Sequence, residues 1–159
     1  MAKFKFGVIL NEDTMVTARV ADSTNPSTNP LADADVGKFV KMIGDSQYGL
    51  CAVGDEIEGV LNSLNTATQD GYAIGGVQKE GRVAVTLDGL QATPGVGVIA
   101  VGSYVVAGTI VARGTALGTA KPKVCKATAA ATGVVFKWRV VALDGTTAVG
   151  QTGLIEFVG

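Results

Sequence analysis

The chain has 159 residues, a formal net charge of −1, and 47 % hydrophobic against only 17 % charged residues. It contains no histidine, which excludes Ser-His-Asp and Cys-His catalysis and leaves the two cysteines short of a zinc site. The near-zero charge gives no bulk attraction to nucleic acid or anionic lipid. We expect a protein that is not an enzyme, uses no cofactor, binds neither nucleic acid nor membrane, and acts by contact.

Residues 1–21 predict two strands. Phe4, Phe6 and Val8 alternate with Lys3 and Lys5, which is typical of a strand with one buried face. A second alternating stretch covers 15–20, and an Asn-Glu-Asp turn at 11–13 separates the two. We interpret 1–21 as an extended N-terminal arm. A first strand folded into its own domain is the alternative.

Residues 22–35 contain a tandem STNP motif that ends at Pro26 and again at Pro30. Each proline restricts its own backbone and disfavours the helical region at the preceding Asn25 or Asn29. The segment has little to bury, so we expect an exposed linker. It is either a stiffened tether for the arm or a long surface loop.

Residues 36–159 predict a β-barrel or β-sandwich, so the fold class is all-β. Turn dipeptides such as Gly44-Asp45 and Gly54-Asp55 separate short strands, and helix signals are limited to a turn or two near 33–40 or 66–70. Phe136, Trp138 and Val140 should face inward from one of these strands. The strands are expected at 36–43, 47–53, 56–63, 72–78, 81–87, 97–101, 104–112, 122–127, 133–142 and 153–158.

The remaining candidate chemistry is sparse. Cys51 and Cys125 have no metal-ligand spacing, and two buried reduced thiols are favoured over a disulfide. Glu56 and Glu58 flank Ile57 and would share one face of a strand, as a carboxylate pair or simply a solvated face. A faint echo of Ala52–Ile57 in Ala100–Val105 suggests either two similar β-units or chance similarity.

Charge and hydropathy also bear on partners. Residues 1–100 carry 12 acidic and 7 basic side chains, whereas 101–159 carry 2 acidic and 6 basic ones. The two halves could attract a neighbouring copy head to tail, or pair within one fold. A mean hydropathy of +0.35 suggests apolar surface covered by another protein, although small residues also raise that value.

Four segments resemble the head-decoration (cement) proteins of tailed bacteriophages. They are DVGKFVK at 35–41, GDEIEGVL at 54–61, QDGYAIGGVQ at 69–78 and GRVAV at 81–85. The resemblance implies a small β-domain, often with a terminal arm, that binds the exterior of an assembled capsid. It also implies two kinds of partner, which are the major capsid protein and other copies of this chain in a homotrimer. The virion would be the location, after synthesis in the bacterial cytoplasm.

An arm or linker that reaches a neighbour would make the contacts of such a protein. The protein-contact candidates are Lys3, Phe4, Lys5, Phe6, Asn25, Pro26, Asn29 and Pro30. Main-chain pairing of the arm with a neighbour's sheet edge would also cover that edge. The alternatives are another phage structural β-domain (tail tube, baseplate or fibre base) and a carbohydrate-binding β-module that uses Tyr48, Tyr72 or Tyr104.

Overall fold

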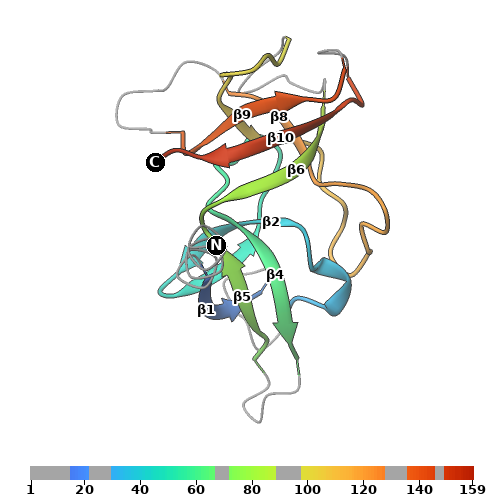
Figure 1. The fold of residues 1–159 in the computed structure, drawn as a ribbon. Coiled ribbons are helices and arrows are strands. Elements are labelled where there is room, and N and C mark those ends of the chain that lie inside the picture. Colours follow the sequence, from blue (N-terminus) through green and yellow to red (C-terminus); the bar gives the residue numbers. More distant parts are fainter. Residues whose placement is uncertain (1–14, 22–29, 67–71, 89–97, 128–135, 146–148) are drawn as a thin grey trace, which may run out of the picture.

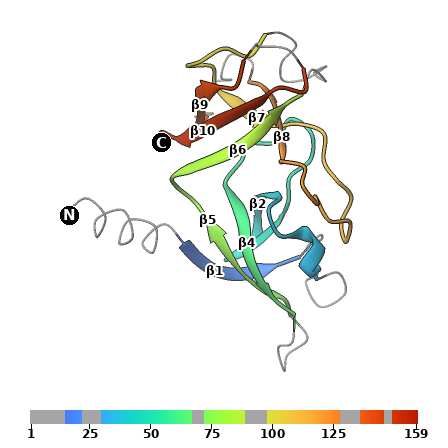
Figure 2. The same ribbon diagram turned by 45° about the vertical axis from the view of Figure 1, so that its right-hand side comes forward.

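A computed structural model describes residues 15–21, 30–66, 72–88, 98–127, 136–145 and 149–159. The regular secondary structure of these residues is almost entirely β, with one short 3₁₀ turn, η1 (Asp33–Asp35), between the first two strands. The predicted all-β class is confirmed. The strands form two lobes stacked one on the other, as Figure 1 and Figure 2 show.

Lobe 1 is a closed barrel with the strand order β1-β3-β2-β4-β5. Its strands are β1 (Met15–Val20), β2 (Phe39–Gly44), β3 (Gln47–Leu50), β4 (Gly59–Asn65) and β5 (Ile74–Gln78). Neighbours are antiparallel except for β1 and β3, which run parallel. Val20, Val40, Leu61 and Val77 point inward and are fully buried, so the barrel interior is a packed core.

Lobe 2 is a sheet with the order β7-β8-β6-β10-β9. Its strands are β6 (Arg82–Leu87), β7 (Val105–Ala107), β8 (Lys123–Lys126), β9 (Trp138–Leu143) and β10 (Thr152–Phe157). Tyr104, just before β7, forms a bridge with Arg139 of β9. The two edges of the sheet therefore meet, and lobe 2 is nearly closed.

The two lobes share one topology, because each strand of lobe 1 has a counterpart five strands later. β1 and β3 are parallel with Val20 opposite Tyr48, and β6 and β8 are parallel with Leu87 opposite Val124. In both lobes the fifth strand pairs antiparallel with the first and the fourth. The register also shifts at the same place, directly after Leu61 in lobe 1 and its counterpart Val140 in lobe 2.

Backbone hydrogen bonds repeat along with the strands. Gly37 and Gly102 both have positive φ (92° and 89°), and their N–H groups donate to Leu61 and Val140 respectively. Three further hydrogen bonds of lobe 1 also have a counterpart in lobe 2. The bond from Val20 N–H to Ala73 O matches the one from Leu87 N–H to Gln151 O, and the bond from Ala21 N–H to Tyr48 O matches the one from Asp88 N–H to Val124 O. The bond from Leu61 N–H to Lys38 O matches the one from Val140 N–H to Ser103 O. The fold is an internal structural repeat.

The echo between Ala52–Ile57 and Ala100–Val105 was the wrong alignment of this repeat. Residues 52–57 lie in the turn and connection between β3 and β4, whereas 100–105 lead into β7. The strand pairing instead makes Phe39 of lobe 1 equivalent to Tyr104 of lobe 2, because Phe39 pairs with Val60 as Tyr104 pairs with Arg139. Few matched residues are identical, so the repeat is hidden from sequence comparison. Identical pairs include Gly37 and Gly102, Val40 and Val105, Leu64 and Leu143, and Gly75 and Gly153.

The predicted arm at 1–21 and linker at 22–35 were wrong in their described parts. β1 is hydrogen-bonded on both sides, by β3 and β5, and therefore belongs to the barrel. Pro30 pairs with Ala21 in an isolated bridge, and Leu31 and Asp35 are buried. These residues are part of the body because barrel closure needs β1 and because Leu31 fills the lobe 1 core. Residues 1–14 and 22–29 lie outside the described part.

Two further expectations needed correction. No strand forms at 98–101, because the chain turns there, with Ser103 N–H donating to Ala100 O and Ile99 inserting into the lobe 2 core. The helical turn near 33–40 is limited to η1. Most other strand predictions were confirmed with shorter ends, including 72–78, 81–87 and 122–127, which contain β5, β6 and β8.

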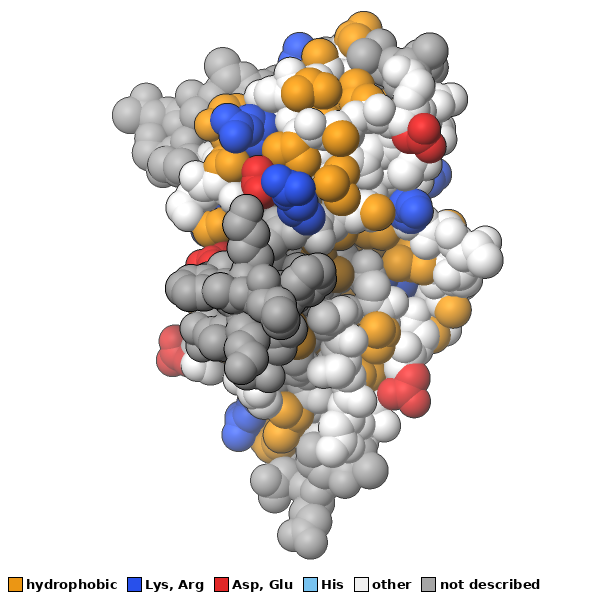
Figure 3. Space-filling model, in the orientation of Figure 1, with side chains coloured by type: hydrophobic (Ala, Val, Ile, Leu, Met, Phe, Trp, Pro, Cys, Tyr) orange, Lys and Arg blue, Asp and Glu red, His pale blue; other side chains and the backbone are white. Residues whose placement is uncertain are grey.

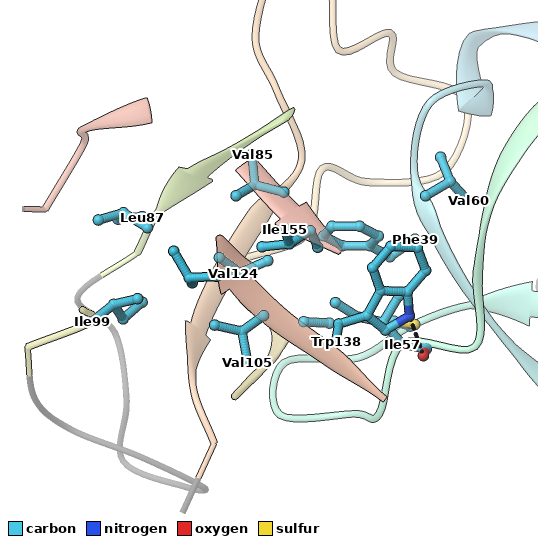
Figure 4. Packing of buried hydrophobic residues seen from close by; sticks show 13 residues of the cluster. Phe39, Ile57, Val60, Val85, Leu87, Ile99, Val105, Val124, Trp138 and Ile155 are labelled. Atoms are coloured by element: carbon cyan, nitrogen blue, oxygen red, sulfur yellow. Dashed lines mark hydrogen bonds between the residues drawn. The ribbon is translucent and has the colours of Figure 1, made fainter. Parts of the chain in front are cut away.

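The largest core cluster crosses the boundary between the lobes. Phe39, Ile57 and Val60 of lobe 1 pack with Trp138 and Ile155 of lobe 2 (Figure 4). Trp138 is fully buried, as its alternation with Arg139 predicted, whereas Phe136 is only half-buried. The lobes therefore share a hydrophobic core and do not merely touch.

Candidate protein-contact surfaces

The sequence-predicted contact residues are mostly outside the described part of the chain. Lys3, Phe4, Lys5, Phe6, Asn25, Pro26 and Asn29 all fall in undescribed segments. Pro30 is described and makes contacts within its own chain, since its carbonyl accepts a 3.1 Å hydrogen bond from Arg113 Nη1. The described contact features are instead the junction between the lobes and the outer face of lobe 2.

The strap, residues 108–122 between β7 and β8, joins lobe 2 to lobe 1. In lobe 1 the matching connection, between β2 and β3, is a tight turn at 45–46. The longer strap reaches back to η1, where Leu117 packs over Gly37, and a Cβ on that glycine would lie 3.3 Å from Leu117 Cδ1. It also covers a small apolar cavity of about 50 Å³ lined by Phe39 and Cys51.

A buried ion pair anchors the strap. Lys38 Nζ lies 2.6 Å from Asp35 Oδ1, and the two side chains are 3 % and 0 % exposed. Asp35 also accepts hydrogen bonds from the N–H groups of Ala32 and Gly114, and Lys38 donates to the Ala112 carbonyl at 2.7 Å. Each charge therefore has partners in lobe 1 and in the strap, which is the condition under which a buried pair is tolerated.

A second contact joins the turn after β3 to β7. Gly54 N–H donates to Ala107 O at 2.8 Å, and Ala107 N–H donates to Asp55 O at 2.9 Å, so the turn extends the edge of the lobe 2 sheet. The Trp138 indole N–H donates to the Ile57 carbonyl at 2.9 Å (Figure 4). These bonds connect a lobe 1 segment to two lobe 2 strands and fix the lobes relative to one another.

Both cysteines are free and buried, which confirms the reduced-thiol prediction. Burial raises the pKa of the Cys51 thiol far above its ordinary value, and the nearby Asp55 carboxylate adds to this. Burial, with a contribution from Asp88, raises the pKa of Cys125 to about 11. Neither thiol is poised as a nucleophile near neutral pH, because nucleophilic cysteines need a lowered pKa.

The carboxylate and tyrosine candidates do not form a convergent site among the described residues. Glu56 and Glu58 precede β4, and the Glu56 carboxylate lies 3.6 Å from Lys137 Nζ. Tyr48 is buried and Tyr72 lies under Arg19, with 4.3 Å from its ring centroid to the guanidinium carbon, while Tyr104 is 44 % exposed. In the described part, no group of three or more acidic or cysteine side chains could hold a metal ion.

The outer face of lobe 2, defined as the outward residues of β6, β10 and β9, carries two rows of side chains. One row is apolar and runs from Ala84 through Leu154 to Ala142. The adjacent row is charged and consists of Arg82, Glu156 and Arg139, with Arg82 Nε 3.1 Å from Glu156 Oε1. Figure 3 shows apolar and basic side chains gathered on this lobe. The small residues leave a shallow hollow along the apolar row.

Sequence reasoning missed the strap, the ion pair and the outer face. Asp35 and Lys38 are spaced i, i+3 and were visible, but their burial depends on residues 112–114, far away along the chain. Alternation along β6 and β9 did indicate which residues point outward. It could not indicate that the three strands lie side by side.

Among the described residues, no helix has the length and apolar content needed to cross a membrane. Comparisons with protein-family models, curated proteins and solved structures each gave no match.

Proposed function

We propose that this chain is a virion structural protein that binds the outer surface of an assembled phage capsid and stabilises it. Its partners are the major capsid protein and further copies of itself in a homotrimer, and it resides on the capsid exterior after synthesis in the host cytoplasm. Stabilisation arises from many weak contacts repeated over the shell, since multivalency multiplies modest interface energies.

The observation that carries the proposal is the fusion of the two lobes through a shared core and buried polar contacts. A shared core, a buried ion pair and three hydrogen bonds from the 54–57 segment hold the lobes in one arrangement. A protein that reinforces a shell must resist deformation between its contact points. Rigid coupling supplies that property, because a flexible connection would let the contact points move apart under load.

The segments that resemble decoration proteins include much of this junction. DVGKFVK contains Asp35 and Lys38, and GDEIEGVL contains Gly54, Asp55 and Ile57. GRVAV begins lobe 2 as β6. The resemblance therefore falls on residues that connect the lobes, and this supports the proposed class of protein beyond the general likeness of glycine-spaced strands.

The test is binding to expanded heads that lack decoration protein. We expect the purified chain to co-sediment with such heads, to saturate, and to raise their melting temperature in scanning calorimetry. Unexpanded heads, on which the binding lattice differs, serve as the control. Absence of both binding and thermal stabilisation would contradict the proposal. Rings or tubes of the purified chain in negative stain would favour a tail component instead.

A further inference from the structure

The strap is an addition to the repeated fold. It runs from lobe 2 down to η1 (orange in Figure 1), whereas lobe 1 closes the same connection with the tight turn at 45–46. The shared topology therefore does not need a strap. Every residue from Thr109 to Pro122 is half-buried or exposed, so the strap buries little apolar surface. Segments with few buried apolar contacts open at a lower free energy than the whole fold.

The contacts that hold the middle of the strap against lobe 1 are mainly polar. Ala112, Arg113 and Gly114 each form a hydrogen bond with lobe 1. Leu117 adds an apolar contact over Gly37. Water replaces hydrogen bonds of this kind when a segment lifts into solvent, so their net contribution to the closed position is small.

The ion pair beneath the strap does not depend on it. Asp35 and Lys38 both belong to lobe 1, and Asp35 also accepts a hydrogen bond from Ala32 N–H. If the strap lifts, the pair loses only its bonds to Ala112 and Gly114, which water can replace. Covering a charge pair removes it from water at a cost in free energy, and lifting the strap returns part of that cost.

The space beneath the strap is imperfectly filled. The strap covers the apolar cavity of about 50 Å³, whose lining includes Phe39, Cys51 and Thr109. The Thr109 hydroxyl oxygen is buried and has no hydrogen-bond partner among the described residues. A buried hydroxyl without a partner costs free energy, and a cavity forfeits packing contacts. These costs oppose the closed position, while the apolar lining favours it, so the two positions differ by a modest free energy.

The two ends of the strap are fixed to lobe 2. Near its start, Thr109 N–H donates to the Asp88 carboxylate. At its end, the Pro122 carbonyl accepts from Thr86 N–H at 3.0 Å. Both partners belong to β6 or directly follow it, so movement of the strap is confined to the residues between these two bonds.

We propose that residues 110–121 of the strap form a lid, which opens as a unit while both lobes stay folded. Opening uncovers the cavity and the thiol of Cys51, which is only 2 % exposed when the lid is closed. The lobes stay joined in the open state by their shared core and by the hydrogen bond from Trp138 to Ile57. This inference goes beyond the proposed function and does not depend on capsid binding.

The test is the rate at which N-ethylmaleimide alkylates each thiol of the purified full chain, with mass spectrometry to locate the adduct. Cys125 is the internal reference, because it is fully buried in β8 and does not line the cavity. Each rate is divided by the rate of the same thiol in the urea-unfolded chain. Where the rate is proportional to the reagent concentration, it reports the population of the open form.

We expect the normalised rate of Cys51 to exceed that of Cys125 by about tenfold or more, because the lid opens more often than the whole fold. The Cys51 rate should also depend less on low concentrations of urea, since opening of the lid exposes less surface than global unfolding.

Two leucine variants test whether the lid controls access to Cys51. Leu117→Ala removes the apolar contact of the lid with Gly37 and should raise the Cys51 rate about fivefold, with no change at Cys125. Leu64→Ala is the matched control, because Leu64 is also half-buried but packs against the core inside lobe 1. We expect it to leave the Cys51 rate unchanged.

Circular dichroism melting verifies that both variants fold. Arg113→Ala, which removes the exposed hydrogen bond to the Pro30 carbonyl, carries the same expectation if Leu117→Ala does not fold. Three results would overturn the inference: equal normalised rates for Cys51 and Cys125, the same urea dependence for both thiols, or a Cys51 rate that the lid variant does not raise above that of Leu64→Ala.

Discussion

Lobe 1 and lobe 2 share a topology, a bulge position and a set of backbone hydrogen bonds, yet they differ in most side chains. Positions that agree in character are the inward ones, such as Val20 with Leu87 and Leu61 with Val140, all buried. Positions that differ face the other lobe or the solvent. The comparison teaches that the fold depends on the buried pattern, and that junction and exposed positions can diverge without changing it.

Two matched sites illustrate this divergence at the junction. Gly59 of lobe 1 is packed so closely that a Cβ would lie 2.5 Å from Val77 Cγ1, whereas its counterpart in lobe 2 is Trp138, which reaches Ile57 of lobe 1. The turn stabilised by Asp35 and Lys38 in lobe 1 uses Ser103 in lobe 2, whose hydroxyl accepts from Ala100 N–H. Equivalent backbone therefore supports a buried charge pair in one lobe and a neutral hydrogen bond in the other.

The largest effect should follow from removal of the buried carboxylate. Asp35→Ala leaves the Lys38 ammonium buried without its counter-ion, so we expect a loss of about 3–5 kcal/mol in the free energy of unfolding. Ser103→Ala, at the matched turn, removes one hydrogen bond and should cost about 1 kcal/mol. Urea denaturation measures both. Equal losses would mean that the ion pair does not anchor the junction.

A smaller difference should separate two matched glycines. A Cβ at Gly75 would lie 2.7 Å from Leu61 Cδ1 and 3.0 Å from the Ser63 carbonyl, whereas at Gly153 the nearest atoms are 3.2 and 3.3 Å away. Overpacking of a core costs about 1–3 kcal/mol, and we expect Gly75→Ala near the upper end and Gly153→Ala near the lower. Thermal melts of the two variants give the order. The reverse order would show that the barrel of lobe 1 is the looser one.

The last prediction concerns how the free energy of unfolding depends on alkaline pH. A thiol in the unfolded chain ionises near its ordinary pKa of 9.0, while the folded chain holds Cys125 protonated up to about pH 11 and Cys51 beyond that. Above pH 9 the unfolded chain therefore binds fewer protons, and the free energy of unfolding should fall by about 1.4 kcal/mol per pH unit for each thiol.

Urea denaturation between pH 8 and pH 11 checks this slope, and the Cys51→Ala, Cys125→Ala double variant is its control. The two proteins share every other ionisable group, so the difference between the slopes isolates the thiols. Identical slopes would mean that the thiols are accessible to solvent in the folded state.

Much of the fold could be predicted from the sequence, but little of the candidate site could. Alternation marked β6 and β9, and glycine-containing turns marked the ends of several strands, because these signals are local. Inclusion of β1 in the barrel depends on pairing with β3 and β5, which lie far along the chain. The repeat was hidden because inward positions tolerate any apolar residue of suitable size, so matched strands need not share letters.

Native-state hydrogen exchange tests most directly whether the two lobes form one rigid body. The amides of Leu61 and Val140 are matched probes, since they donate to the Lys38 and Ser103 carbonyls at equivalent places in lobes 1 and 2. We predict that both amides exchange only through global unfolding, with the same opening free energy and the same dependence on denaturant. An opening free energy for one amide well below that of the other would show that the lobes unfold separately, and would contradict the account.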